Sequence, residues 1–443
     1  MRQLLDAVGR AIVEWTYNAS EPADANSLPA RLQSGADEYR RNRKTPRQVA
    51  TLFGPIRLSR CVYQAVAAGM PGFFPLEHAL GIVAHAATPA LADAVGRLAA
   101  ELTQQQTLDA LAERHHVRWS VGLLRKVTAT LAEALAPLRH AAQVAQLVAW
   151  LEKAEKSRGK FRPTLAVGRD GVMVPMRPCW EEASTATVSV HDRRGKRLGT
   201  VYLGRMPEPG QGMLGDQLTQ LLQAVFAAWQ GVLPRLMYVT DAGSHPQDYF
   251  RRVLRWMKHP RTGQLLSWQW VVDYFHACEY VGKLSEALFG AGAEAATWAA
   301  RMRRVLKEDR GGVKQVLHSA RALRTRRGLA GRRKDFQRAI NYLWKYRHHM
   351  NYLECRRSKL PIGSGVTEAA CKMIFGYRFK QSGMRWKHGH SQHVLDLRVI
   401  LKSRVWEAVR DQWLRRWQPA KTAAAKPQPA KTRPKARKKL LPA

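Results

Sequence analysis

Residues 164–171 read TLAVGRDG, a run of apolar residues that meets a carboxylate at Asp170. A short apolar run bounded by a turn signal such as Asp-Gly predicts a buried strand. Residues 235–241 read RLMYVTD and repeat the pattern, so a second buried strand is expected to end on Asp241. These two stretches decide the predicted fold, because everything between and after them can be placed relative to two strands that each end on an aspartate.

The strands and helices expected between and after these two stretches follow the order of a known fold. Two further strands joined by the turn at 191–196 form an antiparallel pattern with the first. The expected order is strand 164–170, strand 186–190, strand 198–203, helix 216–229, strand 235–241, helix 246–257 and strand 268–275. This is the order of the RNase H-like fold. We therefore predict an α/β protein whose core, a mixed five-stranded sheet, is interrupted by an all-helical insertion. The predicted boundaries are 160–400 for this domain, about 276–350 for the insertion and 401–418 for a C-terminal helix.

The region before residue 155 is predicted to be mainly helical, with a short hairpin or strand near 53–63. Residues 107–135 have the outline of a helix-turn-helix whose second helix is capped by Ser120. Arg118, Arg125 and Lys126 lie near that second helix and are candidate DNA contacts. Plain packing of two amphipathic helices gives the same pattern, so both interpretations stay open.

The charge of the chain points to a polyanionic partner. Lys and Arg number 73 against 34 Asp and Glu, a net charge of +39. Nucleic acid is the favoured partner, because its phosphates are neutralised by Lys and Arg with release of counterions. A basic protein of the ribosome or of a membrane surface is the alternative. Residues 419–443 contain no acidic residue and are expected to be a disordered basic tail.

Other compartments are disfavoured by composition. No run of about 18 apolar residues occurs, so no membrane span is expected. Five scattered cysteines without a CxxC pair indicate reduced thiols in a cytoplasmic protein.

Three carboxylates form the candidate catalytic set. Asp170 and Asp241, 71 residues apart, are expected at the ends of two neighbouring strands, and Glu368, a further 127 residues on, is expected from a helix beside them. Carboxylate oxygens suit Mg²⁺, with Mn²⁺ as a substitute. Two such ions can activate a nucleophile and stabilise a leaving oxygen at one phosphorus. The three residues are therefore predicted to be both catalytic residues and metal ligands.

Five motifs carry a resemblance to a known family: GRDG (168–171), VTDAG (239–243), DYFHACE (273–279), PIGSGVTE (361–368) and QSGMRW (381–386). Residues 165–400 resemble DDE transposases of bacterial insertion sequences, most closely those of the ISKra type. The resemblance implies an RNase H-like core split by a helical insertion and a metal-dependent triad at Asp170, Asp241 and Glu368. It also implies that the partners are terminal-repeat and target DNA, and we expect a homo-oligomer on DNA in the bacterial cytoplasm, at the nucleoid. No nucleotide cofactor is expected, since no nucleotide-binding loop is evident and transesterification exchanges one phosphodiester for another.

Supporting residues are predicted around this set. Asp273 is a rival second carboxylate and resembles, with His276, an element found at the start of the insertion in related transposases. His276 is expected either to contact the scissile phosphate or orient a ligand, or to be a hydrogen-bonded structural histidine; Glu279 is a weaker candidate of the same kind. A basic segment follows Glu368 and suits phosphate contacts and stacking on an unpaired base, with a solvated helix end as the alternative; its residues are Lys380, Arg385, Trp386 and Lys387.

The function predicted from these features is a transposase that cleaves DNA at the ends of its element and joins the freed 3′ ends to target DNA. One alternative is a nuclease or resolvase on the same fold, which would cut without joining. The other is an inactive, transposase-derived DNA-binding protein. The intact Asp, Asp and Glu argue against an inactive protein, while the separate N-terminal region and the insertion argue against a minimal nuclease.

Overall fold

The structure is a computed structural model that describes residues 1–330 and 332–416, so the predicted basic tail at 419–443 lies outside it. The chain forms two compact units. One comprises residues 1–95 and 108–127 with 415–416, and the other comprises 96–107 and 128–414. The expected boundary near residue 155 is not where the units divide. None of the helices in the described ranges is both long enough and apolar enough to cross a membrane.

The N-terminal unit is built around a three-stranded antiparallel sheet in the order β1-β2-β3. Its strands are β1 (Arg31–Ser34), β2 (Asp37–Thr51) and β3 (Gly54–Ala65), and its first helices are α1 (Arg2–Ala19) and α2 (Pro75–Ala79). Val49, Ile56, Leu58 and Leu76 form the core between them. Sequence patterning predicted only a strand near 53–63, because β2 reads DEYRRNRKTPRQVAT and offers little apolar alternation.

The candidate helix-turn-helix corresponds to α4 (Gln104–His115) and α5 (Val121–Glu155), preceded by α3 (Pro89–Glu101). Ser120 does cap the second helix, since its Oγ accepts a hydrogen bond from the Leu123 amide at 3.2 Å. The predicted end of this helix at residue 135 is wrong, because α5 continues for 35 residues with Pro137 inside it. The helix that was expected to read DNA is thus much longer than a recognition helix requires.

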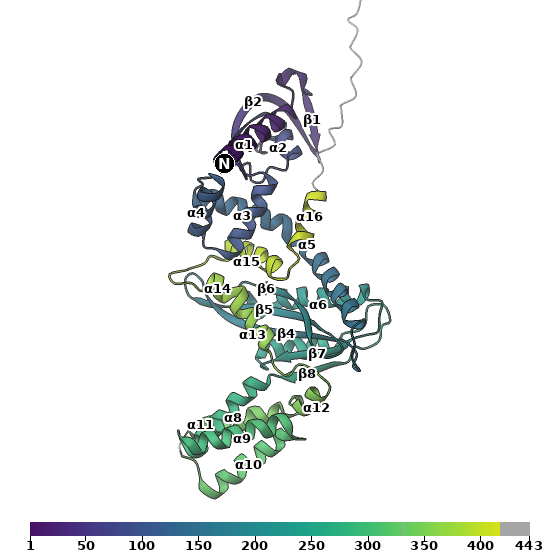
Figure 1. Cartoon of the computed structure of the whole chain (residues 1–443), viewed down its shortest axis with the longest axis vertical. Helices are drawn as coiled ribbons and strands as arrows, with labels where there is room; N and C mark the ends of the chain where they lie inside the picture. The colour runs from purple at the N-terminus through teal and green to yellow at the C-terminus, as the bar shows by residue number, and fades with distance from the viewer. Residues whose placement is uncertain (331, 417–443) are drawn as a thin grey trace, which may run out of the picture. The chain divides into compact units, whose positions relative to one another are not determined.

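A five-stranded mixed sheet forms the centre of the second unit, in the order β6-β5-β4-β7-β8 (Figure 1). Strands β4, β5 and β6 are antiparallel neighbours, whereas β4, β7 and β8 are parallel. The bounds are β4 (Thr164–Pro175), β5 (Trp180–His191), β6 (Arg197–Arg205), β7 (Arg235–Thr240) and β8 (Trp268–Val272). The predicted mixed five-stranded sheet is confirmed, and it is compatible with an RNase H-like core.

Two strand ends differ from the prediction. β4 runs five residues past Asp170, so this carboxylate lies within a strand that continues to pair with β5. β8 stops at Val272, because the side chain of Asp273 caps the following helix instead of extending the strand.

Helices cover both faces of the sheet. α6 (Gly212–Ala228) and α7 (Ser244–Arg252) belong to one face, where Arg169 lies over the ring of Tyr249 at 4.6 Å. The other face holds α13 (Gly365–Ala370) and α15 (His388–Lys402), where Leu395 and Val399 approach Gly204 of β6. Short 3-10 turns complete the connections at Ala25–Ser27, Pro209–Gln211, Leu254–Trp256 and Arg347–His349.

The described residues between β8 and α13 form only helices (Figure 1). They are α8 (Tyr274–Phe289), α9 (Ala293–Glu308), α10 (Gly312–Arg327), α11 (Arg333–Lys345) and α12 (Tyr352–Arg357). Their buried faces join the hydrophobic core of the sheet through side chains such as Val281, Leu306 and Leu343. The C-terminal helix α16 (Trp406–Arg416) starts later than the predicted residue 401, because Arg404 adopts a left-handed φ of 59° and separates it from α15.

The contact between α13 and β4 leaves no room for a side chain at Gly168. A Cβ atom there would lie 1.9 Å from the Oγ1 of Thr367, which itself is hydrogen bonded to the Oγ1 of Thr187 at 2.9 Å. Thr367 is buried in this contact. The helix that carries Glu368 can therefore approach the sheet this closely only because β4 has glycine at this position.

We predict that Gly168→Ala destabilises the second unit by about 1–3 kcal/mol, the usual cost of overpacking a filled core. Gly365→Ala is the matched control: Gly365 lies on α13, the helix that approaches Gly168, and a Cβ there meets nothing within 4 Å. The control should change stability by no more than about 0.5 kcal/mol. Chemical denaturation of both variants measures the difference, and equal stability of the two would contradict the close contact.

Candidate active site

Asp170 and Asp241 are neighbours across the parallel pair β4–β7. The ladder pairs Val167 with Tyr238, an offset of 71 residues, which is also the separation of the two aspartates. Each carboxylate is oriented by a backbone amide: Gly171 donates to Asp170 Oδ1 at 2.8 Å, and Gly243 donates to Asp241 Oδ1 at 2.9 Å. The structure thus brings together the two aspartates that the sequence predicted.

The two carboxylates are close enough to disturb each other electrostatically. The pKa of Asp170 is raised to about 6, mainly by burial and then by the negative charge of Asp241. The Cys371 thiol and the Gly171 amide act in the opposite direction, as hydrogen-bond donors to the carboxylate. A pair of partly buried carboxylates whose charges repel is a donor set that fits a hard divalent cation such as Mg²⁺, which would neutralise them.

Glu368 is in the same neighbourhood, but its carboxylate is turned outward. It lies on α13, its side chain is 61% exposed, and it forms an ion pair with Lys372 one turn later at 2.8 Å. Among the described residues, no three His, Cys, Asp or Glu side chains are grouped as a ready metal site. Asp170 and Asp241 are therefore set in place, whereas Glu368 would have to leave Lys372 to join them.

Cys371 contacts one of the three predicted catalytic residues, Asp170, and sequence reasoning missed it. Its Sγ donates to Asp170 Oδ2 at 3.4 Å. Burial raises the pKa of the Cys371 thiol, and the carboxylates of Asp170, Glu368 and Asp241 each raise it further. A signal existed in the sequence, since Glu368 and Cys371 are three residues apart and so share one side of a helix.

The loop after Asp241 is held by two tyrosines of the helical insertion. Tyr342 of α11 donates a hydrogen bond to the Asp241 carbonyl at 2.8 Å, and Tyr346, one turn later, contacts the Ala242 carbonyl at 3.3 Å. Ala242 has a left-handed φ of 66°, a conformation that is strained for a residue with a side chain. The insertion thus stabilises the backbone that presents Asp241, a role that the strand pattern alone could not reveal.

Asp273 has a structural role that links two helix starts. Its Oδ1 caps α8 by accepting from the Phe275 amide at 2.9 Å, and its Oδ2 accepts from the Ser364 hydroxyl at 2.6 Å. Ser364 immediately precedes α13, so Asp273 positions the helix that carries Glu368. Both oxygens of this 6% exposed side chain are engaged, which favours positioning over its role as a rival second carboxylate.

His276 and Glu279 pair with each other. The His276 Nδ1 lies 3.3 Å from Glu279 Oε2, and the imidazole ring packs edge-on against Tyr280 and Tyr342. Since Tyr342 also holds the Asp241 loop, His276 borders the site through this aromatic group. The two alternatives that the sequence left open for His276, contact with the scissile phosphate or a structural role, both stay predictions.

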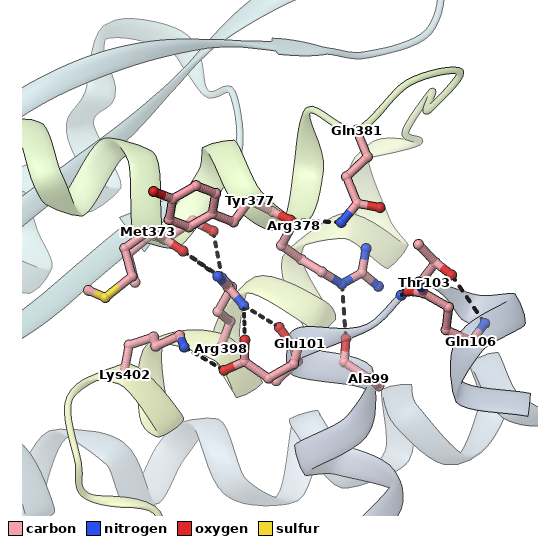
Figure 2. Close-up of polar contacts among 12 residues, drawn as sticks. Ala99, Glu101, Thr103, Gln106, Met373, Tyr377, Arg378, Gln381, Arg398 and Lys402 are labelled. Atoms are coloured by element: carbon pink, nitrogen blue, oxygen red, sulfur yellow. Dashed lines mark hydrogen bonds and ion pairs between the residues drawn. The ribbon is translucent and has the colours of Figure 1, made fainter. Parts of the chain in front are cut away.

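A buried arginine fastens the segment that follows Glu368 (Figure 2). The chain after α13 forms a π-helix, η5 (Cys371–Gly376), and then a single turn, α14 (Tyr377–Phe379). Arg398 of α15 donates from Nε to the carbonyls of Met373 and Ile374, both at 2.9 Å, and from Nη1 to the Ala100 carbonyl at 2.6 Å and to Glu101 at 3.0 Å. A π-helix leaves its carbonyls less regularly bonded than an α-helix does, and the guanidinium supplies the missing donors.

A second buried arginine, Arg378, lies beside Arg398. Its Nε donates to the Ala99 carbonyl at 3.1 Å (Figure 2). Its guanidinium lies 5.1 Å from the centre of the Trp386 ring. The pKa of Arg378 is lowered to about 10, mainly by burial and then by the charge of Arg398. Glu101 pairs with Arg398 and Lys402 and is the carboxylate nearest to this group of cations. These contacts fix η5, and with it Cys371 against Asp170.

The stacking role predicted for Trp386 is wrong. Its side chain is 8% exposed, packs against Phe379, and donates from Nε1 to the Phe379 carbonyl at 3.1 Å. It is a core residue because the backbone of Trp386 pairs with Pro175 and Arg177 at the end of β4. The three cations of the same segment, Lys380, Arg385 and Lys387, are exposed and stay candidates for phosphate contact.

The predicted DNA contacts of the N-terminal region are at the surface. Arg118, Arg125 and Lys126 are all exposed. Arg118 and Trp119 line a cavity of about 490 Å³ together with Arg47 and His116. A basic cavity with an aromatic wall is compatible with contact to a nucleic-acid backbone, which stays a prediction for these residues.

Comparison with known proteins adds no name to this site. No family model matches the chain, and no curated protein matches it. Assignment to a family therefore depends on the motifs and on the geometry described above.

The pKa of Asp170 leads to a testable pH dependence. Because the folded-state value of about 6 lies above the ordinary value of 3.8, the charged carboxylate destabilises the fold. This cost is absent below about pH 4, grows between about pH 4 and 6 and is complete above about pH 6. Without divalent cations, Asp170→Asn should raise the unfolding free energy by about 1–3 kcal/mol at pH 8 and leave it unchanged at pH 4. Denaturant unfolding at both pH values measures this, with exposed Asp309→Asn as the control; an equal effect at both would contradict the assignment.

Arg398 is expected to act as a positioning residue for Cys371. Arg398→Lys keeps the charge but replaces the planar guanidinium, which donates from Nε to Met373 and Ile374 and from Nη1 to Ala100, with a compact ammonium that lacks this fork. The segment η5 should therefore loosen, and the Cys371 thiol should react faster with a thiol reagent. Mass spectrometry of labelled peptides measures the rate, with Lys402→Met as the control that removes only a contact to Glu101. Cys61 and Cys355, both buried elsewhere, report on global unfolding. Faster labelling of all three thiols alike would show a general loss of stability and would overturn the positioning role.

Proposed function

We propose that this protein is a DDE-type DNA transposase that uses Asp170, Asp241 and Glu368 to cleave and join DNA strands. The observation that carries the proposal is that the three carboxylates are linked by geometry: Asp170 and Asp241 share the register of the parallel pair β4–β7, and Cys371, three residues after Glu368, donates a hydrogen bond to Asp170 at 3.4 Å. The three carboxylates come from positions up to 198 residues apart in the chain, on β4, after β7 and on α13. Carboxylates from distant segments that converge at one sheet edge are typical of metal-dependent phosphoryl-transfer sites.

The sheet supports the same class of enzyme. In chain order its strands lie as 3-2-1-4-5, with the second strand antiparallel to the first and the fourth and fifth parallel to it. This arrangement is compatible with an RNase H-like core, in which the first and fourth strands are neighbours. Asp170 lies in the first of these strands and Asp241 directly follows the fourth, which supports the interpretation of their positions as catalytic.

Each residue has a separate task in the proposed reaction. Asp170 and Asp241 would hold divalent cations, which supply Lewis-acid stabilisation of the attacking and leaving oxygens when they are bound. The Glu368 carboxylate is the only one of the three that faces outward. It would therefore break its ion pair with Lys372 and turn toward Asp170 and Asp241. Lys372 would then be free to contact a DNA phosphate. Asp273 and Arg398 would keep α13 and η5 in position while Glu368 moves.

Charge supports DNA as the substrate. The net charge of +39 suits a chain that lies along a polyanion. Exposed cations occur in the segment after Glu368, at Lys380, Arg385 and Lys387, and in the N-terminal region, at Arg118, Arg125 and Lys126. Sequence-specific ends and non-specific target DNA would both be bound in this way, with base contacts rather than phosphate contacts supplying the specificity.

The test is a strand-transfer assay with Mg²⁺ and DNA taken from either side of the chain's own coding sequence. Wild-type protein should nick this DNA and join its 3′ ends to a plasmid. Asp170→Asn, Asp241→Asn and Glu368→Gln should each lower the rate by about a thousandfold or more, since each removes several kcal/mol of charge stabilisation. DNA binding, measured by a mobility shift, should stay within a few fold of wild type.

Asp309→Asn is the matched control, because it neutralises an exposed carboxylate in the same unit far from the three residues in sequence. It should retain full activity. Cleavage without joining would assign the chain to the hydrolytic nucleases of this fold. Near-normal activity of any one of the three variants would remove that residue from the proposed site.

A further inference from the structure

The first helix of the chain, α1, has two apolar faces. One face packs on the N-terminal sheet through Val13 and Tyr17. It is fastened there by polar contacts: Glu14 accepts from the Arg57 amide at 3.0 Å, and Asn18 accepts from the Ser59 amide at 2.8 Å. The orientation of α1 on its own unit is thus determined, and this determines what the opposite face presents.

The opposite face carries large apolar side chains in the open. Leu5, Val8, Ile12 and Trp15 are 61%, 48%, 58% and 74% exposed, and Leu4 beside them is also exposed. No residue of α1 is buried to the extent of a core residue. A row of this length is unusual on the surface of a water-soluble unit, where exposed apolar side chains are normally scattered singly.

The spacing of these residues identifies the kind of partner. The intervals between Leu5, Val8, Ile12 and Trp15 are three, four and three residues, which is the a/d repeat of a coiled-coil seam. Such a seam fits another helix with the same repeat. We propose that α1 pairs with α1 of a second copy of this chain and forms a homodimer contact.

Charge on α1 is compatible with a second copy and disfavours other partners. The helix carries two basic residues, Arg2 and Arg10, and two acidic residues, Asp6 and Glu14, so it has no net charge. The positions that flank the seam include Gly9, Ala11 and Thr16, which are uncharged, so two copies would not repel each other there. A helix that lies on a membrane surface would instead carry an excess of Lys and Arg on its polar face. The apolar seam also offers nothing to a DNA phosphate.

The size of the seam predicts a weak dimer. Five side chains, each removing roughly 60–120 Å² of apolar surface from water on full burial, would cover roughly 400–500 Å² per copy. The total of about 900 Å² lies just below the 1,000 Å² or so that stable interfaces exceed. Pairing should therefore depend on protein concentration in solution. The proposal does not depend on the transposase function, although a dimer would place two candidate sites on one assembly.

Sedimentation velocity of the full-length chain over a range of roughly 1–100 μM tests the proposal. Wild-type protein should pass from monomer to dimer, whereas Val8→Glu with Ile12→Glu should stay monomeric throughout. The control variants Gln3→Glu and Ala7→Glu add the same charge to exposed positions of α1 outside the seam, and they should dimerise as wild type does. Circular dichroism checks that the variants fold, which is expected because the changed residues are exposed.

A charge-reversal experiment identifies the surface directly. Protein with Val8→Lys and Ile12→Lys should also be monomeric alone, but mixed with the Val8→Glu, Ile12→Glu protein it should form a heterodimer, for either relative direction of the two helices. A monomeric wild-type chain at 100 μM would overturn the proposal. Dimers that survive the paired glutamates, or charge-reversed variants that do not combine, would show that a different surface joins the copies.

Discussion

The second unit of the chain depends on the close approach of α13 to β4 at Gly168. A methyl group at Gly168 would not fit between the strand and the helix, because the Thr367 hydroxyl occupies the space that a Cβ would fill. This contact fixes the positions of the residues next to Gly168 in β4 and next to Thr367 in α13. Asp170 lies two residues after Gly168, on the same face of β4. Glu368 directly follows Thr367 in α13, and Cys371 lies about one helical turn after Thr367. A single glycine thus sets the register between two of the predicted catalytic carboxylates.

The third carboxylate is placed by a different part of the chain. Asp241 follows β7, and its backbone is held by Tyr342 and Tyr346 from the helical insertion. The insertion therefore contributes to the site as well as to the core. Ala242 remains in a strained left-handed conformation because the two tyrosine hydroxyls satisfy the carbonyls on both sides of the turn. Strain that is maintained by long-range contacts is common where a backbone must present a side chain in one orientation.

Two buried arginines hold the segment η5 in place. Arg378 and Arg398 are each 2% exposed, and the carbonyls of η5 and of the α3 C-terminus accept most of their hydrogen bonds. Burying guanidinium groups costs free energy unless their donors are satisfied, so the segment that contains Cys371 has little freedom to shift. By contrast, Glu368 is held only by an exposed ion pair with Lys372, which water and salt weaken. The site thus combines two fixed carboxylates with one that can change partner at low cost.

Much of the architecture was determined by the sequence itself. Apolar runs that meet Asp170 and Asp241 predicted two adjacent strands, and the order of strands and helices predicted the mixed sheet, because local periodicity records which face of an element is buried. Local pattern failed where a role depends on contacts between distant segments. The charged strand β2 shows no alternation of apolar and polar residues, so it was not predicted. Trp386 lies among cations, as an aromatic residue that contacts nucleic acid would, but it is enclosed by Phe379 and the end of β4. The residues next to Cys371 and Arg398 in the chain do not indicate which distant groups these two side chains contact. The sequence by itself determined the residue types at the site and the strands that carry two of them; only the tertiary structure decided which side chains meet, since that depends on packing between segments as much as 298 residues apart.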